Sequence, residues 1–296
     1  MLLIENIYIC NTCDDCIRRI DVKGFNLEKL QLKSKGKEIG PRSIDIKGGI
    51  GVVANSYENS ISFLDLINLN EYYREYIGPN PKDIKFYKKY VCILCNEINS
   101  IILYNIMSKT IDFAIPSGSY PESFTIDSKN DLMLVSNLME STVSCIDLKN
   151  RKLDKGIKVG EYPSKIIFSK DKNLFYVCET NIGKDKDGFI GIYSINDFKL
   201  IKRIKVGIIP SDICEYNGNI YVTNFGEGTV RVINIKTGRE IKKINLGGML
   251  NKVIKTENEM YISDYINGIL YVIDEKLEKL KTIAIGNEPN AMILVN

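Results

Sequence analysis

One short motif occurs seven times at nearly even spacing, and this repeat constrains the fold more than any other feature of the sequence. Each copy is a β-rich run that ends in a polar residue, as Tyr221-Val222-Thr223-Asn224 does, and a short turn and a second Val- and Ile-rich run follow. Such a pattern predicts a β-hairpin. The copies are 44, 41, 41, 42, 45 and 40 residues apart and end at Asn11, Asn55, Asn96, Asn137, Glu179, Asn224 and Asp264.

Proline marks a second position of the same period. Gly stands three residues before five of these prolines, and a Gly–Pro pair of this kind favours a tight connection between strands,. A short apolar run follows each proline, so each period holds four short strands and no convincing helix. About 40 residues and four strands describe one blade of a β-propeller. Asn251 takes the seventh place of a series otherwise made of Pro41, Pro81, Pro121, Pro163, Pro210 and Pro289.

The repeat therefore predicts an all-β chain: a seven-bladed propeller of four-stranded antiparallel blades, forming a single domain over residues 1–296. The last run, 290–295, begins a blade that residues 1–40 complete, so pairing of the two termini would close the ring and cover two strand edges. A ring closed in this way needs no second copy, and we expect a monomer. The blades are expected to start near residues 41, 81, 121, 163, 210, 251 and 289.

The Tyr-Val-Thr-Asn copy at 221–224 and the Val-Gly-x-x-Pro turns at 159–163 and 206–210 give the chain a family resemblance. With the period of about 40 residues, they resemble the YVTN-repeat β-propellers, including the YncE-like proteins. The resemblance covers essentially the whole chain and implies the propeller fold. It implies little about function, because propellers host many unrelated activities.

The composition excludes several classes of site. The chain of 296 residues contains no His and no Trp, so Ser-His-Asp and Cys-His catalysis and His-ligated metals are absent. We expect no cofactor. The N-terminal residues lack the basic and apolar regions of a signal peptide, and no apolar run is long enough to span a membrane. These features favour a cytoplasmic protein with reduced cysteines.

The polar residues that end the seven motifs have two interpretations. They are turn caps, since Asn and Asp side chains bond nearby backbone, or they are ligand-binding groups around the mouth of the central channel. Sameness in all blades favours the cap. Glu179 and Asp264 depart from the Asn rule and bring charge, so they are the strongest ligand-binding candidates. The full candidate set is Glu179, Asp264, Asn224, Asn137, Asn96, Asn55 and Asn11.

Cys10, Cys13 and Cys16 have a spacing that suggests a metal site. Cys10 and Cys16, however, fall at repeat positions that carry small residues in other blades, and no His completes a ligand set. We therefore predict two small strand residues and a thiol in the turn, with metal ligation as the weaker alternative.

Alternating strand direction places the hairpin turns and the Gly-x-x-Pro connections on one face, called here the connection face. Its turns are mostly acidic, at Asp14, Asp15, Glu58, Glu97, Glu140, Asp185, Asp187 and Glu227. The opposite, lysine-rich face has Lys88, Lys89, Lys129, Lys170 and Lys172. The two faces predict a charge-split disc that the net charge of +3 conceals,.

Three functions follow. The first is a non-catalytic binding or scaffold propeller that engages a protein or a small ligand through the connection face. The second is an enzyme of the propeller lactonase or lyase type, using carboxylates such as Glu179 and Asp264 in place of His. The third is a weak nucleic-acid binder that uses the lysine-rich face.

Overall fold

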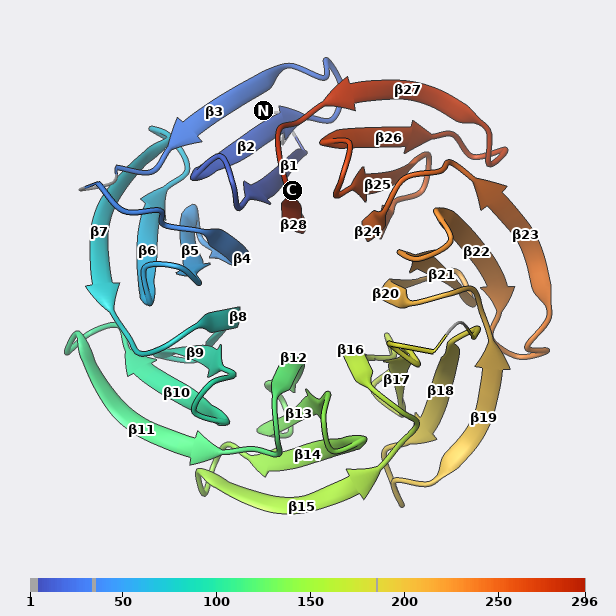
Figure 1. The fold of residues 1–296 in the computed structure, drawn as a ribbon. Helices are drawn as coiled ribbons and strands as arrows, with labels where there is room; N and C mark the ends of the chain where they lie inside the picture. Colours follow the sequence, from blue (N-terminus) through green and yellow to red (C-terminus); the bar gives the residue numbers. More distant parts are fainter. Residues whose placement is uncertain (1–4, 34–35, 185, 296) are drawn as a thin grey trace.

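The computed structural model describes residues 5–33, 36–184 and 186–295, and its strands form a closed ring (Figure 1). Seven antiparallel sheets of four strands each surround a central channel, which confirms the seven-bladed propeller predicted from the repeat. Residues 1–4 and Asp185, which entered the predictions on the N-terminus and on the acidic turns, lie outside the described residues.

The blades are numbered from the first proline, and each runs outward from the channel. Blade 1 consists of β4 (Pro41–Lys47), β5 (Ile50–Asn55), β6 (Ser60–Asp65) and β7 (Asn70–Tyr76). Blade 2 consists of β8 (Pro81–Tyr87), β9 (Tyr90–Cys95), β10 (Ser100–Asn105) and β11 (Thr110–Pro116). Blade 3 consists of β12 (Pro121–Asp127), β13 (Leu132–Asn137), β14 (Thr142–Asp147) and β15 (Lys152–Lys158). Blade 4 consists of β16 (Pro163–Phe168), β17 (Leu174–Glu179), β18 (Phe189–Ser194) and β19 (Leu200–Lys205).

The remaining blades complete the circle. Blade 5 consists of β20 (Pro210–Tyr216), β21 (Asn219–Asn224), β22 (Thr229–Asn234) and β23 (Glu240–Asn245). Blade 6 consists of β24 (Leu250–Lys255), β25 (Met260–Asp264), β26 (Ile269–Ile273) and β27 (Lys279–Ala284). Blade 7 consists of β28 (Pro289–Val295), β1 (Asn6–Asn11), β2 (Cys16–Asp21) and β3 (Leu27–Gln31).

The two ends of the chain meet in blade 7. Strand β28 is the innermost strand and pairs antiparallel with β1, with Asn6 opposite Val295 and Cys10 opposite Ala291. The Thr12 amide donates to the Glu288 carbonyl at 3.1 Å, which continues the contact into the turn. This pairing is the predicted closure, and it leaves the ring without an open interface between its first and last blades.

The core consists of seven buried hydrophobic clusters, each between two adjacent blades. Tyr87 of blade 2 and Phe124 of blade 3, for example, belong to the same cluster. The second strand of each blade supplies apolar residues to both neighbours; in β9 every residue is buried. Each sheet therefore has two buried faces, and the near-continuous apolar runs of the second strands follow from that.

The strand register corrects one boundary. In blade 6, Leu250 lies opposite Asp264, as Pro210 lies opposite Asn224 in blade 5. Leu250 thus stands in the place of proline, and Asn251 is the next residue along. The prediction of Asn251 for this place is wrong by one residue, because Leu250 resembles the apolar run that follows each proline.

Within residues 5–33, 36–184 and 186–295, no helical segment has the length and apolarity needed to cross a bilayer.

Candidate functional site

The polar residues at the ends of the second strands are buried rather than displayed. Asn11, Asn55, Asn137, Glu179, Asn224 and Asp264 are each at most 1% exposed. Four of these side chains accept a hydrogen bond from a backbone amide of the connection that enters the same blade: Asn137, Glu179, Asn224 and Asp264. Asn11 instead donates to the Asn287 carbonyl at 3.3 Å, and Asn55 donates to the hydroxyls of Ser60 and Ser62. The Gly160 amide donates to Glu179 Oε1 at 2.9 Å, the Gly118 amide to Asn137 Oδ1 at 3.1 Å, and the Gly207 amide to Asn224 Oδ1 at 3.0 Å.

These hydrogen bonds explain the motif glycine in blades 3, 4 and 5, whereas Gly78 and Gly286, at the same motif position, have a positive φ. A Cβ on Gly160 would lie 2.2 Å from Glu179 Oε2, and one on Gly118 would lie 2.5 Å from Asn137 Nδ2. Neither glycine has a positive φ. Glycine is therefore required here by the close approach of the polar side chain and not by backbone freedom, which is the reason that its pairing with proline first suggests.

Blade 2 departs from the pattern, and the sequence motif places its polar residue one position too late. Cys95 lies opposite both Pro81 and Ser100, as Asn137 lies opposite Pro121 and Thr142 in blade 3. Cys95 therefore takes the place that the other blades give to Asn, Glu or Asp. Asn96 is the next residue; its side chain is buried, and neither amide atom has a hydrogen-bond partner among the described residues.

Glu179 and Asp264, the charged members, have more partners than the asparagines. Tyr193 Oη donates to Glu179 Oε1 at 2.7 Å, and Arg203 Nε lies 2.8 Å from Oε2. Burial and the Glu179 carboxylate raise the pKa of Tyr193. Glu179 also borders a surface pocket of about 430 Å³ beside Arg203 and Lys184.

Asp264 closes the corresponding turn of blade 6. Its Oδ1 accepts from the Met249 amide at 3.1 Å, and its Oδ2 accepts from Asn267 Nδ2 at 2.7 Å. These contacts account for both charged residues as parts of the turns. Their binding of a ligand stays a prediction.

The channel is lined by a different set of residues. In every blade the pairing of the innermost strand with its neighbour skips one residue directly after the proline or Leu250. Such a β-bulge redirects side chains. Two consecutive residues of each blade consequently face the channel: Arg42 and Ser43, Lys82 and Asp83, Glu122 and Ser123, Ser164 and Lys165, Ser211 and Asp212, Asn251 and Lys252, and Asn290 and Ala291.

These residues enclose a cavity of about 510 Å³. Thr180, Ile182, Ile209, Phe225 and Tyr265 also border it, and they come from turns and a connection of the connection face. The cavity therefore extends to the turns of that face. None of the seven residues chosen from the sequence lines it.

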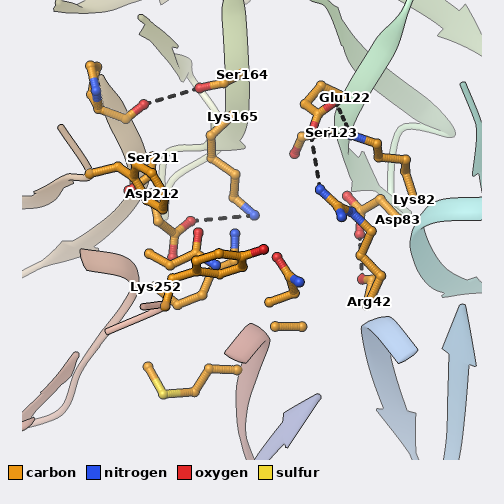
Figure 2. Close-up of a pocket in the computed structure, with 18 of the residues that line it drawn as sticks. Arg42, Lys82, Asp83, Glu122, Ser123, Ser164, Lys165, Ser211, Asp212 and Lys252 are labelled. Atoms are coloured by element: carbon orange, nitrogen blue, oxygen red, sulfur yellow. Dashed lines mark hydrogen bonds and ion pairs between the residues drawn. The ribbon is translucent and has the colours of Figure 1, made fainter. Parts of the chain in front are cut away.

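Charged side chains meet from both sides of this channel pocket (Figure 2). On one side, Lys165 Nζ lies 3.6 Å from Asp212 Oδ1. On the other side, Lys82 Nζ lies 2.7 Å from Glu122 Oε2, and Arg42 reaches the other oxygen of that carboxylate at 3.9 Å. With Lys85, Lys252 and Asp83, the pocket contains five cations and three carboxylates.

Burial and charge act differently on the lysines. Burial, reinforced by the nearby charges of Lys165 and Arg42, lowers the pKa of Lys252, and the Asp212 carboxylate opposes this. Burial also disfavours the charged form of Lys165, but Asp212 and Asp83 outweigh it and raise the pKa of that group. The two ammonium groups share one local electrostatic environment, because Asp212 and Asp83 act to raise the pKa of both and the charge of Lys165 lowers that of Lys252.

The cysteines near the N-terminus separate. Cys10 and Cys16 are buried in blade 7, and Cys13 is exposed in the turn between them. Burial, together with Glu288, raises the pKa of Cys13 to about 11. Among the residues that the structure describes, no group of three Cys, Asp or Glu side chains is arranged to hold a metal ion.

Three of the seven described acidic residues in the turns of the connection face form ion pairs: Glu58, Asp187 and Glu227. Glu58 lies 2.7 Å from Arg74, and Asp187 lies 2.6 Å from Lys205. On the lysine-rich face, several lysines lie over aromatic rings, including Lys88 over Tyr87 at 5.1 Å. Local pairing of this kind weakens the charge-split disc expected from the sequence.

The comparisons with known proteins agree with the fold. No protein family and no curated protein matches the sequence. Among solved structures, the chain is similar to a functionally unknown protein from Desulfotomaculum acetoxidans, with a TM-score of 0.80 and 16% identity over 98% of this chain and 99% of that one. It is also similar to Kuenenia stuttgartiensis hydrazine synthase, with a TM-score of 0.78 and 14% identity over 88% and 92%. At these identities the likeness establishes the seven-bladed propeller alone.

The sequence contained a signal for the channel residues that its repeat obscured. The two residues after each proline differ in charge and size from blade to blade, whereas the motif ends are nearly uniform. The uniform motif ends were the predicted site residues, whereas the variable residues after the prolines line the channel.

Proposed function

We propose that this chain is a non-catalytic binding propeller of the YVTN-repeat type, which receives its ligand or partner in the channel pocket from the connection face. The channel pocket carries this proposal: fourteen side chains from all seven blades converge on a cavity of about 510 Å³, within the size range of small-molecule sites. The pocket extends to the turns of the face that the sequence also favours for binding.

Three of the four serine hydroxyls in the channel pocket, those of Ser43, Ser164 and Ser211, support binding rather than nucleophilic catalysis. Ser164 Oγ donates to the Pro210 carbonyl, and Ser211 Oγ donates to the Leu250 carbonyl at 2.8 Å. Ser43 Oγ donates to Asp83 Oδ1 at 2.8 Å, and that carboxylate already accepts two backbone amides. A nucleophile needs a base free to take its proton, and these serines instead hold structural hydrogen bonds.

The test compares two serine substitutions. Ser164→Trp fills the channel pocket, and Ser108→Trp places the same side chain in the exposed β10–β11 turn on the opposite face. Both proteins and the wild type are purified from the native host, and native mass spectrometry identifies what each retains. We expect a bound molecule in the wild type and in Ser108→Trp, and its loss from Ser164→Trp. Equal occupancy in all three proteins, or none in the wild type, would contradict the proposal.

A further inference from the structure

The three carboxylates of the channel pocket form hydrogen bonds or ion pairs within the protein. Asp83 Oδ2 accepts from the Phe124 amide of blade 3 at 3.2 Å, and Asp212 Oδ2 accepts from the Val253 amide of blade 6 at 3.1 Å. Each bond ties an innermost strand to that of the next blade. Glu122 bonds the Lys82 ammonium with both oxygens, at 2.9 and 2.7 Å. Asp83, Glu122 and Asp212 thus already have partners within the protein.

The cations of the channel pocket are less completely paired. Among the described residues, no carboxylate oxygen lies within 4.0 Å of the ammonium of Lys252 or Lys85. Asp45 does not line the cavity; burial raises the pKa of its carboxyl while the charge of Lys85 lowers it, and its Oδ2 accepts from the Phe86 amide at 2.7 Å. Lys165 reaches Asp212 only at 3.6 Å, beyond a normal N–H···O hydrogen bond,.

Ser123 adds an independent sign of a missing partner. Its side chain is 4% exposed, it lines the channel pocket, and its Oγ has no hydrogen-bond partner among the described residues. Buried hydroxyl groups are nearly always hydrogen-bonded. An oxygen of a bound molecule would satisfy this hydroxyl.

Lys165 and Ser123 occupy the same register position in adjacent blades, the second residue after the proline, and Lys252 occupies that position in blade 6. The Lys165 side chain remains 24% exposed although protein surrounds it. Protein walls of low dielectric concentrate the field of such charges. The excess of two cations in the pocket then favours a negatively charged ligand.

We propose that Lys165, Lys252 and Ser123 bind the acidic group, a carboxylate or a phosphate, of a small organic anion in the channel pocket. This assignment rests on the proposed function, since it names the ligand class of the same pocket. Lysine suits either group because its ammonium acts as a point charge with three donors. A macromolecule that inserts an acidic segment is a separate possibility, which the test below distinguishes.

Isothermal titration calorimetry tests the assignment with three probes: succinate, inorganic phosphate and a hexaglutamate peptide. The variants are Lys165→Met with Lys252→Met, Ser123→Ala, and Lys199→Met as a matched control whose side chain is 80% exposed in the β18–β19 turn. A charge-assisted hydrogen bond contributes about 1.5–3 kcal/mol, so loss of both lysines should weaken binding at least tenfold. Ser123→Ala should weaken it several-fold, and Lys199→Met should leave it unchanged.

Binding of succinate or phosphate with this pattern supports the assignment, and the better probe names the acidic group. Binding of the hexaglutamate peptide alone overturns it in favour of a protein segment. Absence of binding by the wild type at millimolar probe, or equal binding by the double lysine variant, also overturns it.

Comparison with the Ser164→Trp variant shows whether a negative result contradicts only the anion assignment or also the proposed function. A ligand lost in Ser164→Trp but kept in the double lysine variant leaves the pocket as the binding site and removes only the anion assignment. A ligand kept in both variants contradicts both proposals.

Discussion

Two rings of polar residues encircle the channel, and they differ in how strictly the repeat conserves them within this chain. The outer ring lies at the ends of the second strands, where six of seven blades carry Asn, Glu or Asp and blade 2 carries Cys95. The inner ring lies two residues after the proline position and contains Ser43, Asp83, Ser123, Lys165, Asp212, Lys252 and Ala291.

The difference follows from what each ring contacts. In five of the seven blades the outer-ring side chain bonds the main chain of the connection, so similar polar chemistry suits these positions: Asn11, Asn137, Glu179, Asn224 and Asp264. An inner-ring side chain faces the channel, where one ligand breaks the sevenfold symmetry. In a repeat protein, uniform polar positions therefore point to structural hydrogen bonds, and variable ones that face a cavity point to the site.

The largest effect is expected from the outer ring. Glu179→Ala removes the acceptor of the Gly160 amide and of Tyr193 Oη and leaves Arg203 without its carboxylate. We expect the free energy of unfolding to fall by about 3 kcal/mol, as measured by urea denaturation. Glu179→Gln retains an acceptor oxygen and should lose less than half as much. A loss below 0.5 kcal/mol in the alanine variant would show that this ring is not structural.

A neutral member of the outer ring should matter less. Asn137→Ala removes hydrogen bonds to the Gly118 amide, Thr142 and Ser144. We expect a loss of about 1–3 kcal/mol in the same denaturation assay. Asn150→Ala is the control, because that amide bonds only the exposed Asp147 and should change stability by about 0.5 kcal/mol or less,. Equal losses of unfolding free energy in the two variants would show that the outer-ring asparagine contributes no more than a surface asparagine.

Blade 2 offers a change in the opposite direction. Asn96 is buried with an unpartnered amide, and blade 3 has Leu138 at the equivalent position. Asn96→Leu keeps the branching at Cγ and removes the unsatisfied groups, so stability should rise by about 1 kcal/mol. A higher melting temperature in calorimetry would confirm it. A decrease would mean that the amide has a partner, and that Asn96 is part of the conserved hydrogen bonding after all.

The inner ring should separate stability from binding. Lys252→Met removes a half-buried charge that has no carboxylate oxygen within 4.0 Å among the described residues, and it keeps an unbranched apolar side chain. We expect unfolding free energy to change by about 0.5 kcal/mol or less while the affinity for succinate or phosphate falls. A large loss of stability without loss of affinity would reverse the roles of the two rings.

Sequence alone was sufficient for the architecture. Seven motif copies, the prolines in phase with them and the position of the last run predict seven blades and their closure by β28. These features are local and repeated, and the alternation of apolar residues in short strands leaves few other ways to bury them. The misplacements, Asn96 for Cys95 and Asn251 for Leu250, are each one residue, because only the register distinguishes adjacent positions at a turn.

The site depended on the tertiary structure. A β-bulge after each proline turns two consecutive residues toward the channel, and residues such as Ser123, Lys165 and Lys252, which lie 42 and 87 positions apart along the chain, meet only when the ring closes. The charge balance in the channel likewise depends on the closed ring, because it brings charged residues of several blades together. Asp83 and Asp212, for example, accept hydrogen bonds from backbone amides of the neighbouring blades. Periodicity within one blade describes how that blade folds, but the chemistry at the centre comes from seven blades at once.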